Sequence, residues 1–314
     1  MTPARLVVVL LALFCSTGRA QQASPFLGRW DLTVATANGP RPSWLEIQTS
    51  GPRTLVGRFV GIVGSARPIS KIDVTGETFS FSIPPQWESG DKDLRVEGRV
   101  EGDHLAGSLT NPSGTHATWT AARAPSLHRD APVEWGDPIE IFNGRDTSGW
   151  HADRGTSQWV VVDHTLTSPK SGANLVSDQR FTDFTLHVEF RCPKGSNSGV
   201  YLRGRYEVQI ADAPGLDAEG PGAIYGFLAP ADDVSMKPGA WQAFDVLLKG
   251  RMVEVILNGT TIIANQEIPG ITGGALDSDE GAPGPLMLQG DHGPIEFRKI
   301  RQAGEVAAPL DGHH

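Results

Sequence analysis

The sequence has very little cysteine, with Cys15 and Cys192 the two examples in 314 residues. Cys15 ends an apolar run that begins at Leu6, and small residues lead from there to Ala20. This pattern is typical of a secretory leader, so we expect residues 1–20 to be a signal peptide that is cleaved near Ala20. The mature chain then keeps Cys192 alone, which excludes an intrachain disulfide even in an oxidising compartment.

Long apolar runs are also missing. The run from Leu6 to Cys15 is much shorter than the roughly 20 residues that a membrane span needs, and no later segment comes closer. Lipidation of Cys15 is an alternative, but a lipobox has small residues before its cysteine, whereas this chain has Leu13 and Phe14. We therefore expect an exported protein without a membrane span, either periplasmic or secreted.

Positive charge is in deficit, since 27 Lys and Arg stand against 36 Asp and Glu for a net charge of -9. No basic block interleaved with aromatic residues occurs, which disfavours nucleic acid and anionic membrane surfaces as partners. Helical periodicity is missing as well, while 37 Gly and 23 Pro indicate frequent turns. Together these features predict an all-β protein.

Several motifs of familiar chemistries are absent, namely Gly-x-Ser-x-Gly, His-Glu-x-x-His, paired cysteines and a Gly-rich phosphate loop. No tightly bound nicotinamide cofactor is indicated. A divalent metal ion stays open, because Asp277, Asp279 and Glu280 cluster in one Gly-rich loop. Solvated charge is the other explanation of that cluster, since its spacing fits no defined metal-binding loop.

The chain divides into two β-rich parts. Residues 24–123 form short alternating segments separated by turn residues about every ten positions, which predicts a small antiparallel barrel or half-barrel, lipocalin-like or accessory. Residues 124–134 lack periodicity and contain prolines, as linkers do. Residues 135–303 again alternate and predict a jelly-roll β-sandwich, and residues 304–314 are expected to be a flexible tail.

Strands are expected in the second part at Thr185 to Arg191, Gly199 to Arg203 and Tyr206 to Ile210. Their period of two separates apolar from polar side chains. If the strands are neighbours, the polar side chains form one sheet face with the donors and acceptors that sugar hydroxyls need. The candidate ligand-binding residues on this face are Glu189, Arg191, Tyr201, Arg203, Glu207 and Gln209. A solvated outer sheet face is the alternative reading.

Loops near these strands supply further candidates. His292 follows Asp291 in a loop, and a histidine beside a carboxylate is a common general acid or base near neutral pH, although it can also cap a turn. The other polar loop candidates are Asn197, Asp212 and Gln289. Trp87, Trp150 and Tyr225 lie in expected loops, where aromatic rings either stack on sugars or fill the core.

A family resemblance follows from many separate segments in the second part. Among them are Phe142-Asn143-Gly144, Asn197 to Arg203, Tyr206 to Ile210, Gly222 to Tyr225, Gly284-Pro285-Leu286 and His292-Gly293. In this order they resemble the 3-keto-disaccharide hydrolase domain, a family similar in fold to concanavalin A-like lectins and glucanases. The resemblance covers about half of the chain and leaves out the first part.

The resemblance implies cleavage of glycosides whose sugar carries a ketone at position 3. It also implies that a separate glycoside 3-dehydrogenase makes the substrate. A ketone acidifies the neighbouring ring C–H, so one base can remove that proton while the glycosidic oxygen leaves with help from an acid. The resulting oxyanion needs a nearby donor or cation.

We accordingly assign Glu207 as the base and His292 as the general acid, with Arg203 and Gln209 stabilising and positioning the keto-sugar. Substrate contacts from Glu189, Arg191, Tyr201, Asn197, Asp212 and Gln289 are the remaining candidates. Two other functions stay open. One is an ordinary glycoside hydrolase acting on unmodified glycans with two carboxylates, and the other is a non-catalytic, lectin-like carbohydrate-binding protein.

Overall fold

The computed structural model describes residues 24–307, and none of these residues is helical. The first eight strands each pair with the next in antiparallel fashion and close into a barrel. Their bounds are β1 Gly28–Thr36, β2 Gly39–Ser50, β3 Thr54–Val60, β4 Arg67–Thr75, β5 Thr78–Ile83, β6 Leu94–Glu101, β7 His104–Thr110 and β8 His116–Arg123. The sequence predicted either a barrel or a half-barrel, and the structure shows a closed barrel.

Closure depends on the pairing of β1 with β8, in which Trp30 lies opposite Arg123 and Val34 opposite Trp119. Alternation places Trp30, Leu32 and Val34 inside, where all three are buried. A closed barrel has no free strand edge, so its backbone groups are satisfied without a partner chain.

The second body consists of the remaining strands, which belong to one 12-stranded sheet system. Their bounds are β9 Ile139–Glu140, β10 Trp150–Ala152, β11 Val160–Val162, β12 Thr165–Ser168, β13 Leu175–Arg191, β14 Asn197–Leu202, β15 Tyr206–Ala211, β16 Gln242–Lys249, β17 Met252–Leu257, β18 Thr260–Glu267, β19 Gly284–Leu288 and β20 Ile295–Ala307. The main path runs β11-β12-β20-β13-β16-β17-β18, while β19 joins β13 to the β14–β15 hairpin. The jelly-roll connectivity stays a prediction.

Two tight turns follow from local chemistry. Asn258 and Gly259 connect β17 to β18 with φ values of 52° and 84°, the positive-φ pair that a two-residue hairpin needs. Arg203 and Gly204, with φ values of 53° and 67°, turn the chain between β14 and β15. The regular part of β14 therefore ends at Leu202, one residue before the end expected from the sequence.

The structure tests the expectation for the C-terminal end of the chain but not the one for its N-terminal end. The proposed signal peptide, residues 1–20, lies outside the described residues. Strand β20 continues to Ala307 and pairs there with Arg180 of β13, so the ordered strand extends past residue 304, where the tail was expected to begin. Between Arg123 and Ile139 the structure has no strand, in the region expected as a linker. No described residue belongs to a helix long and apolar enough to cross a membrane.

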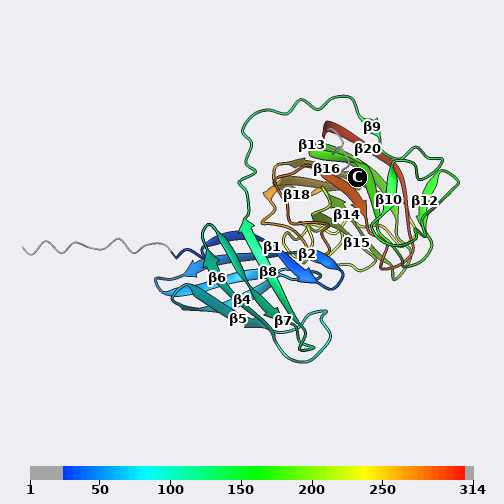
Figure 1. Ribbon diagram of the computed structural model, residues 1–314. Helices are drawn as coiled ribbons and strands as arrows, with labels where there is room; N and C mark the ends of the chain where they lie inside the picture. Colours follow the sequence, from blue (N-terminus) through cyan, green and yellow to red (C-terminus); the bar gives the residue numbers. More distant parts are fainter. Residues whose placement is uncertain (1–23, 308–314) are drawn as a thin grey trace, which may run out of the picture.

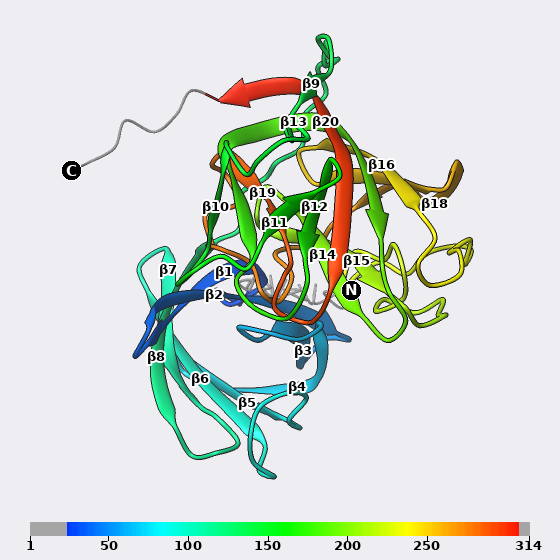
Figure 2. The same ribbon diagram turned by 90° about the vertical axis from the view of Figure 1, so that its right-hand side faces the viewer.

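The barrel packs against the second body through β1, β2 and the loops beside them (Figures 1 and 2). Trp44 of β2 is completely buried in the hydrophobic core of the second body, and its ring meets Phe227 edge-on at 5.1 Å between centroids. Gly270 leaves room for this indole, since a Cβ there would lie 2.0 Å from Trp44 Nε1. The backbone N–H of Gly274 donates to Ile62 O at 2.9 Å across the same boundary.

Candidate active site

A cavity of about 630 Å³ opens where the β14–β15 hairpin meets the barrel. Its volume lies within the range of ligand-binding clefts. Tyr201, Glu207 and Gln209 form its floor from β14 and β15, and the loop after β19 adds Gln289, Asp291 and His292. The barrel contributes Val63, Gly64 and Trp87. The cavity therefore takes residues from both parts of the chain.

Glu207 is the most deeply buried acidic residue in the cavity lining and is only 3% exposed. It lies opposite Tyr201 in the antiparallel register, and the Tyr201 hydroxyl donates to Glu207 Oε2 at 2.8 Å. Gly199 makes space for the carboxyl group, because a Cβ at that position would lie 2.2 Å from Glu207 Oε1. Burial raises the pKa of Glu207 to about 8, against the Tyr201 hydrogen bond and the His292 charge, which lower it.

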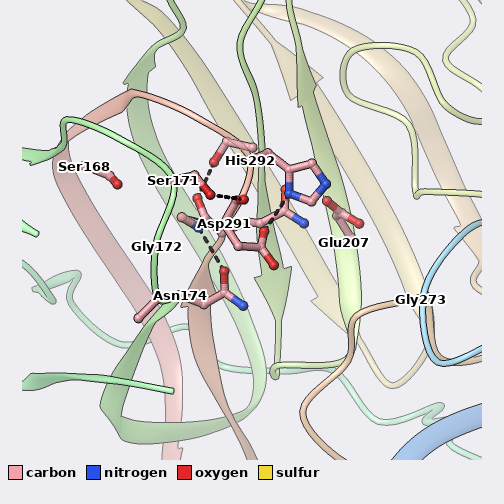
Figure 3. A network of polar contacts seen from close by, with 12 residues as sticks. Ser168, Ser171, Gly172, Asn174, Glu207, Gly273, Asp291 and His292 are labelled. Carbon is pink, nitrogen blue, oxygen red and sulfur yellow. Dashed lines mark hydrogen bonds and ion pairs between the residues drawn. The ribbon is translucent and has the colours of Figure 1, made fainter. Parts of the chain in front are cut away.

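His292 faces Glu207 from a loop fixed by backbone hydrogen bonds (Figure 3). The N–H of Gly290 donates to Asn174 Oδ1 at 2.9 Å, and the Ser171 hydroxyl donates to Asp291 O at 2.5 Å. His292 Nδ1 bonds Asp291 Oδ1 at 2.6 Å, which leaves Nε2 free to act on a ligand. That bond raises the pKa of His292 more than burial lowers it, so the imidazolium persists to higher pH.

Two amide oxygens in the cavity wall are buried without a donor. Gln209 Oε1 and Gln289 Oε1 have no hydrogen-bond partner in the described part of the protein. A buried acceptor without a partner is costly, and sugar hydroxyls are donors of the right kind to satisfy it. Asn197, at the start of β14, brings a third amide to the same wall.

Arg203 is not brought to the cavity. Its positive φ takes it out of the strand, and its guanidinium Nη2 donates to Tyr206 Oη at 3.1 Å and to Gly250 O at 2.9 Å in the interior. The expectation that it shares a face with Glu207 relied on a period of two continuing past Leu202. The turn between β14 and β15 interrupts that period.

Glu189, Arg191 and Asp212 also lie away from the cavity lining. Glu189 pairs with Arg298 and Lys299 of β20, and Arg191 pairs with Glu296 of the same strand. The expected continuous polar face is therefore not formed. Strand β13 pairs with β16, β19 and β20 and has no direct pairing with β14 or β15, so its polar side chains form ion pairs with β20 instead. Asp212 Oδ2 accepts from the N–H of Gly195 at 2.6 Å and stabilises a turn.

Of the ten residues selected from the sequence, the structure gathers six around the cavity, namely Asn197, Tyr201, Glu207, Gln209, Gln289 and His292. Sequence reasoning did not select Asp217, Glu219 or Gly273 as site residues, and it did not place the barrel beside the cavity. A signal was present in Gly273-Gly274, since a Cβ at Gly274 would lie 2.6 Å from the Tyr201 hydroxyl. Consecutive glycines indicate close backbone approach but not what approaches.

Metal ligands do not gather in the described residues, which contain no group of three or more His, Cys, Asp and Glu side chains placed to hold an ion. In the acidic loop considered above, Asp277 accepts from Arg205 Nε at 2.7 Å. Glu280 is buried and paired with Arg251. Both carboxylates therefore have cationic partners within the protein, and Glu280 is not solvated.

Fold and cavity define an all-β protein of two bodies with an acid-lined, amide-rich cavity between them. The chain belongs to the 3-keto-alpha-glucoside-1,2-lyase-like domain family, whose match covers residues 137–302. All the cavity residues of the second body lie within that match. The barrel lies outside it.

Individual relatives match parts of the chain. The 3-keto-disaccharide hydrolase of Bacteroides thetaiotaomicron is 31% identical over 113 residues, which is 32% of this chain and 38% of that protein. The match thus spans well under half of that relative. A structure of a candidate glycosyl hydrolase from Parabacteroides distasonis is 28% identical with a TM-score of 0.48, covering 57% of this chain and 94% of that one. A second from the same organism is 20% identical with a TM-score of 0.47, covering 54% and 94%.

Proposed function

We propose that this protein cleaves the glycosidic bond of 3-keto-glycosides, with Glu207 as the base and His292 as the general acid. The observation that carries the proposal is a buried carboxyl group with a raised pKa facing a histidine held by a carboxylate in a sugar-sized cavity. Acid and base groups with shifted pKa values gather at catalytic sites. The family match and the name of the Bacteroides relative support the substrate class.

The proposed reaction begins at the ring carbon C2, beside the ketone. Glu207 takes the C2 proton, the electron pair forms the C1–C2 double bond, and the glycosidic oxygen leaves from C1 with a proton from His292. Water then adds to the unsaturated ketone, which makes the net reaction a hydrolysis. A carboxylate with a pKa near 8 is a stronger base than an ordinary glutamate, although roughly one molecule in ten is ionised at pH 7.

Tyr201 can hydrogen-bond to Glu207 both before and after the proton transfer. Its hydroxyl has one hydrogen but two acceptors, Glu207 Oε2 at 2.8 Å and Gly273 O at 2.9 Å. While Glu207 is ionised, the hydroxyl donates to the carboxylate. After Glu207 is protonated, the carboxyl donates to the Tyr201 oxygen and the hydroxyl turns to Gly273 O. The Tyr201 hydroxyl and the Glu207 carboxyl group therefore each keep a hydrogen-bond partner in both states, which favours reversible protonation of a buried acid.

Negative charge develops on the ketone oxygen during proton removal and needs donors. The amide groups of Gln209 and Asn197 lie in the cavity wall and are proposed to supply them. Gln209 thereby keeps the role expected from the sequence. Arg203 does not, because its guanidinium is bonded in the interior.

The proposal is tested with a 3-keto-glucoside and its unoxidised parent, following the released aglycone and sugar by mass spectrometry. We expect release from the keto form alone. Deuterium at C2 is expected to slow the reaction, because the C2–H bond breaks in the proposed step. Cleavage of the parent would instead indicate an ordinary glycoside hydrolase, and binding of both without cleavage would indicate a lectin-like protein.

Replacing Asp291 by Asn is expected to move the pH optimum of kcat/KM to lower pH. Asp291 raises the pKa of His292 through their hydrogen bond, and its charge also raises that of Glu207. Without this charge, His292 loses its proton at lower pH, which reduces activity on the alkaline side. Glu207 ionises at lower pH, which increases activity on the acid side. Initial rates between about pH 5 and 9 measure the shift.

Asp178→Asn is the matched control, because Asp178 Oδ1 bonds His151 at 2.7 Å in an equivalent but exposed pair outside the cavity. Its profile should coincide with that of the wild type. An optimum that stays in place in Asp291→Asn, or moves to higher pH, contradicts the assignment of His292 as the acid.

A further inference from the structure

The barrel forms one wall of the cavity through the loops that carry Val63, Gly64 and Trp87. Trp87 is 66% exposed, the highest value among the large hydrophobic side chains that are exposed in the described residues. Its place in the cavity lining leaves an apolar ring face on which the C–H face of a sugar can stack.

Hydrogen bonds and an ion pair fix the loop around Trp87. Glu88 Oε2 accepts from the backbone N–H of Gln86 at 2.8 Å and from that of Trp87 at 3.2 Å. The same carboxylate pairs with Arg67 at 2.7 Å, where both side chains are largely buried. Gln86 Nε2 donates to the Ser65 hydroxyl at 2.6 Å and ties the two barrel loops together. The Trp87 backbone is therefore held before any ligand arrives.

Tyr225 connects this loop to the catalytic groups. Burial and the charges of Glu219 and Glu207 raise the pKa of Tyr225 to about 12, against a hydrogen bond with Trp87 that lowers it. The backbone N–H of Tyr225 also donates to Glu207 O at 3.0 Å. Tyr225 lines the same cavity as Glu207 and Trp87.

The size and charge of the cavity limit the kind of ligand that can bind beside Trp87. At ~30 Å³ per water molecule its volume corresponds to about 20 waters, which is room for more than one sugar ring. Asp217 and Glu219 lie in the wall near Tyr225, and none of the described lining residues is Lys or Arg. Carboxylates accept hydroxyl hydrogens but repel anions, so the wall favours a neutral polyol.

We propose that Trp87, with Tyr225, Asp217 and Glu219, forms the subsite for the leaving half of the substrate, a neutral sugar ring whose C–H face stacks on the indole. The identity of the first ring rests on the proposed function, whereas the subsite itself rests on the cavity. The barrel then determines which glycosides are accepted, and Trp87 is a specificity residue supplied from outside the family-matched part of the chain.

The test measures binding by calorimetry in the Glu207→Gln background, so that the outcome does not depend on turnover. The two probes are a neutral 3-keto-disaccharide and methyl 3-keto-glucoside, which lacks the second ring. Trp87→Ala should weaken binding of the disaccharide roughly tenfold and leave the methyl glycoside unchanged. Trp87→Phe should keep most of the affinity, and Val162→Ala, an exposed change on β11, should alter neither.

Equal loss for both probes would overturn the subsite, because Trp87 would then act through the fold. Unchanged binding of the disaccharide, or no binding of either probe, would also overturn it. The proposed function fails separately, when the wild type leaves every 3-keto-glycoside intact. In that case a Trp87-dependent preference for the disaccharide would still support the subsite.

Discussion

Replacing Glu207 by Gln is expected to lower turnover of a 3-keto-glycoside by about a hundredfold to ten-thousandfold while making the protein more stable at alkaline pH. The amide keeps the size of the carboxyl group and can still accept the hydrogen bond from Tyr201. It cannot take a proton from C2. Loss of activity together with a gain in stability is the pattern of a catalytic group that is held at a cost to the fold.

The stability gain follows from the sign of the pKa shift. The pKa of Glu207 is raised to about 8 in the folded protein, from an ordinary value of 4.5. The folded state therefore binds this proton more tightly than the unfolded state, and its contribution is fully present below about pH 4.5. As pH rises toward 8, the free energy of unfolding falls by up to ~1.4 kcal/mol per pH unit from this group.

Urea unfolding at about pH 6 and 8 measures this difference, and Glu207→Gln should show the smaller fall in stability between the two. Glu77→Gln, an exposed change on the turn before β5, is the matched control and should follow the wild type. Near wild-type turnover in Glu207→Gln would remove Glu207 from the mechanism. If the stability of Glu207→Gln fell as steeply as that of the wild type, the pKa of Glu207 would not be raised in the folded protein.

Arg251→Met is expected to cost about 3 to 5 kcal/mol of stability, because it leaves a buried charge without its partner. Arg251 Nη2 pairs with Glu280 Oε2 at 2.6 Å, with side-chain exposures of 7% and 0%. Tyr206 donates to the same carboxylate at 2.7 Å. Asp31 of barrel strand β1 lies nearby, and burial followed by the charge of Glu280 raises its pKa to about 9.

This cluster lies where the barrel meets the second body, so the substitution should weaken that contact as well as the local fold. Arg301→Met is the control, since Arg301 and Glu140 form a half-exposed pair that should contribute no more than about 1 kcal/mol. Adding Glu280→Gln to Arg251→Met should restore part of the loss, because the isolated charge is then removed. A cost for Arg251→Met no larger than that of the control would mean that the cluster is hydrated.

Local patterning in the sequence was sufficient for most of the strands. Alternation identified β15 at nearly its observed bounds and the last part of β13, from Thr185 to Arg191, although β13 begins at Leu175. Asn258-Gly259 has the residue types of the hairpin turn that leads to β18. The same period of two correctly put Glu207 and Gln209 on one face of β15. These features depend on neighbours in the chain, whose geometry is set by the pleat and by turn chemistry.

The sequence by itself determined the all-β class, the strand segments, the side of β15 that carries the acid and, by family resemblance, the substrate class to test. The tertiary structure alone decided that Glu189 and Arg191 pair with β20, that Arg203 turns inward, and that Trp87 of the barrel lies at the cavity. The physical reason is that strand order and the docking of two bodies arise from contacts between residues far apart in the chain. Alternation records which side chains share a face of one strand, but it carries no information on which strand, or which body, lies beside it.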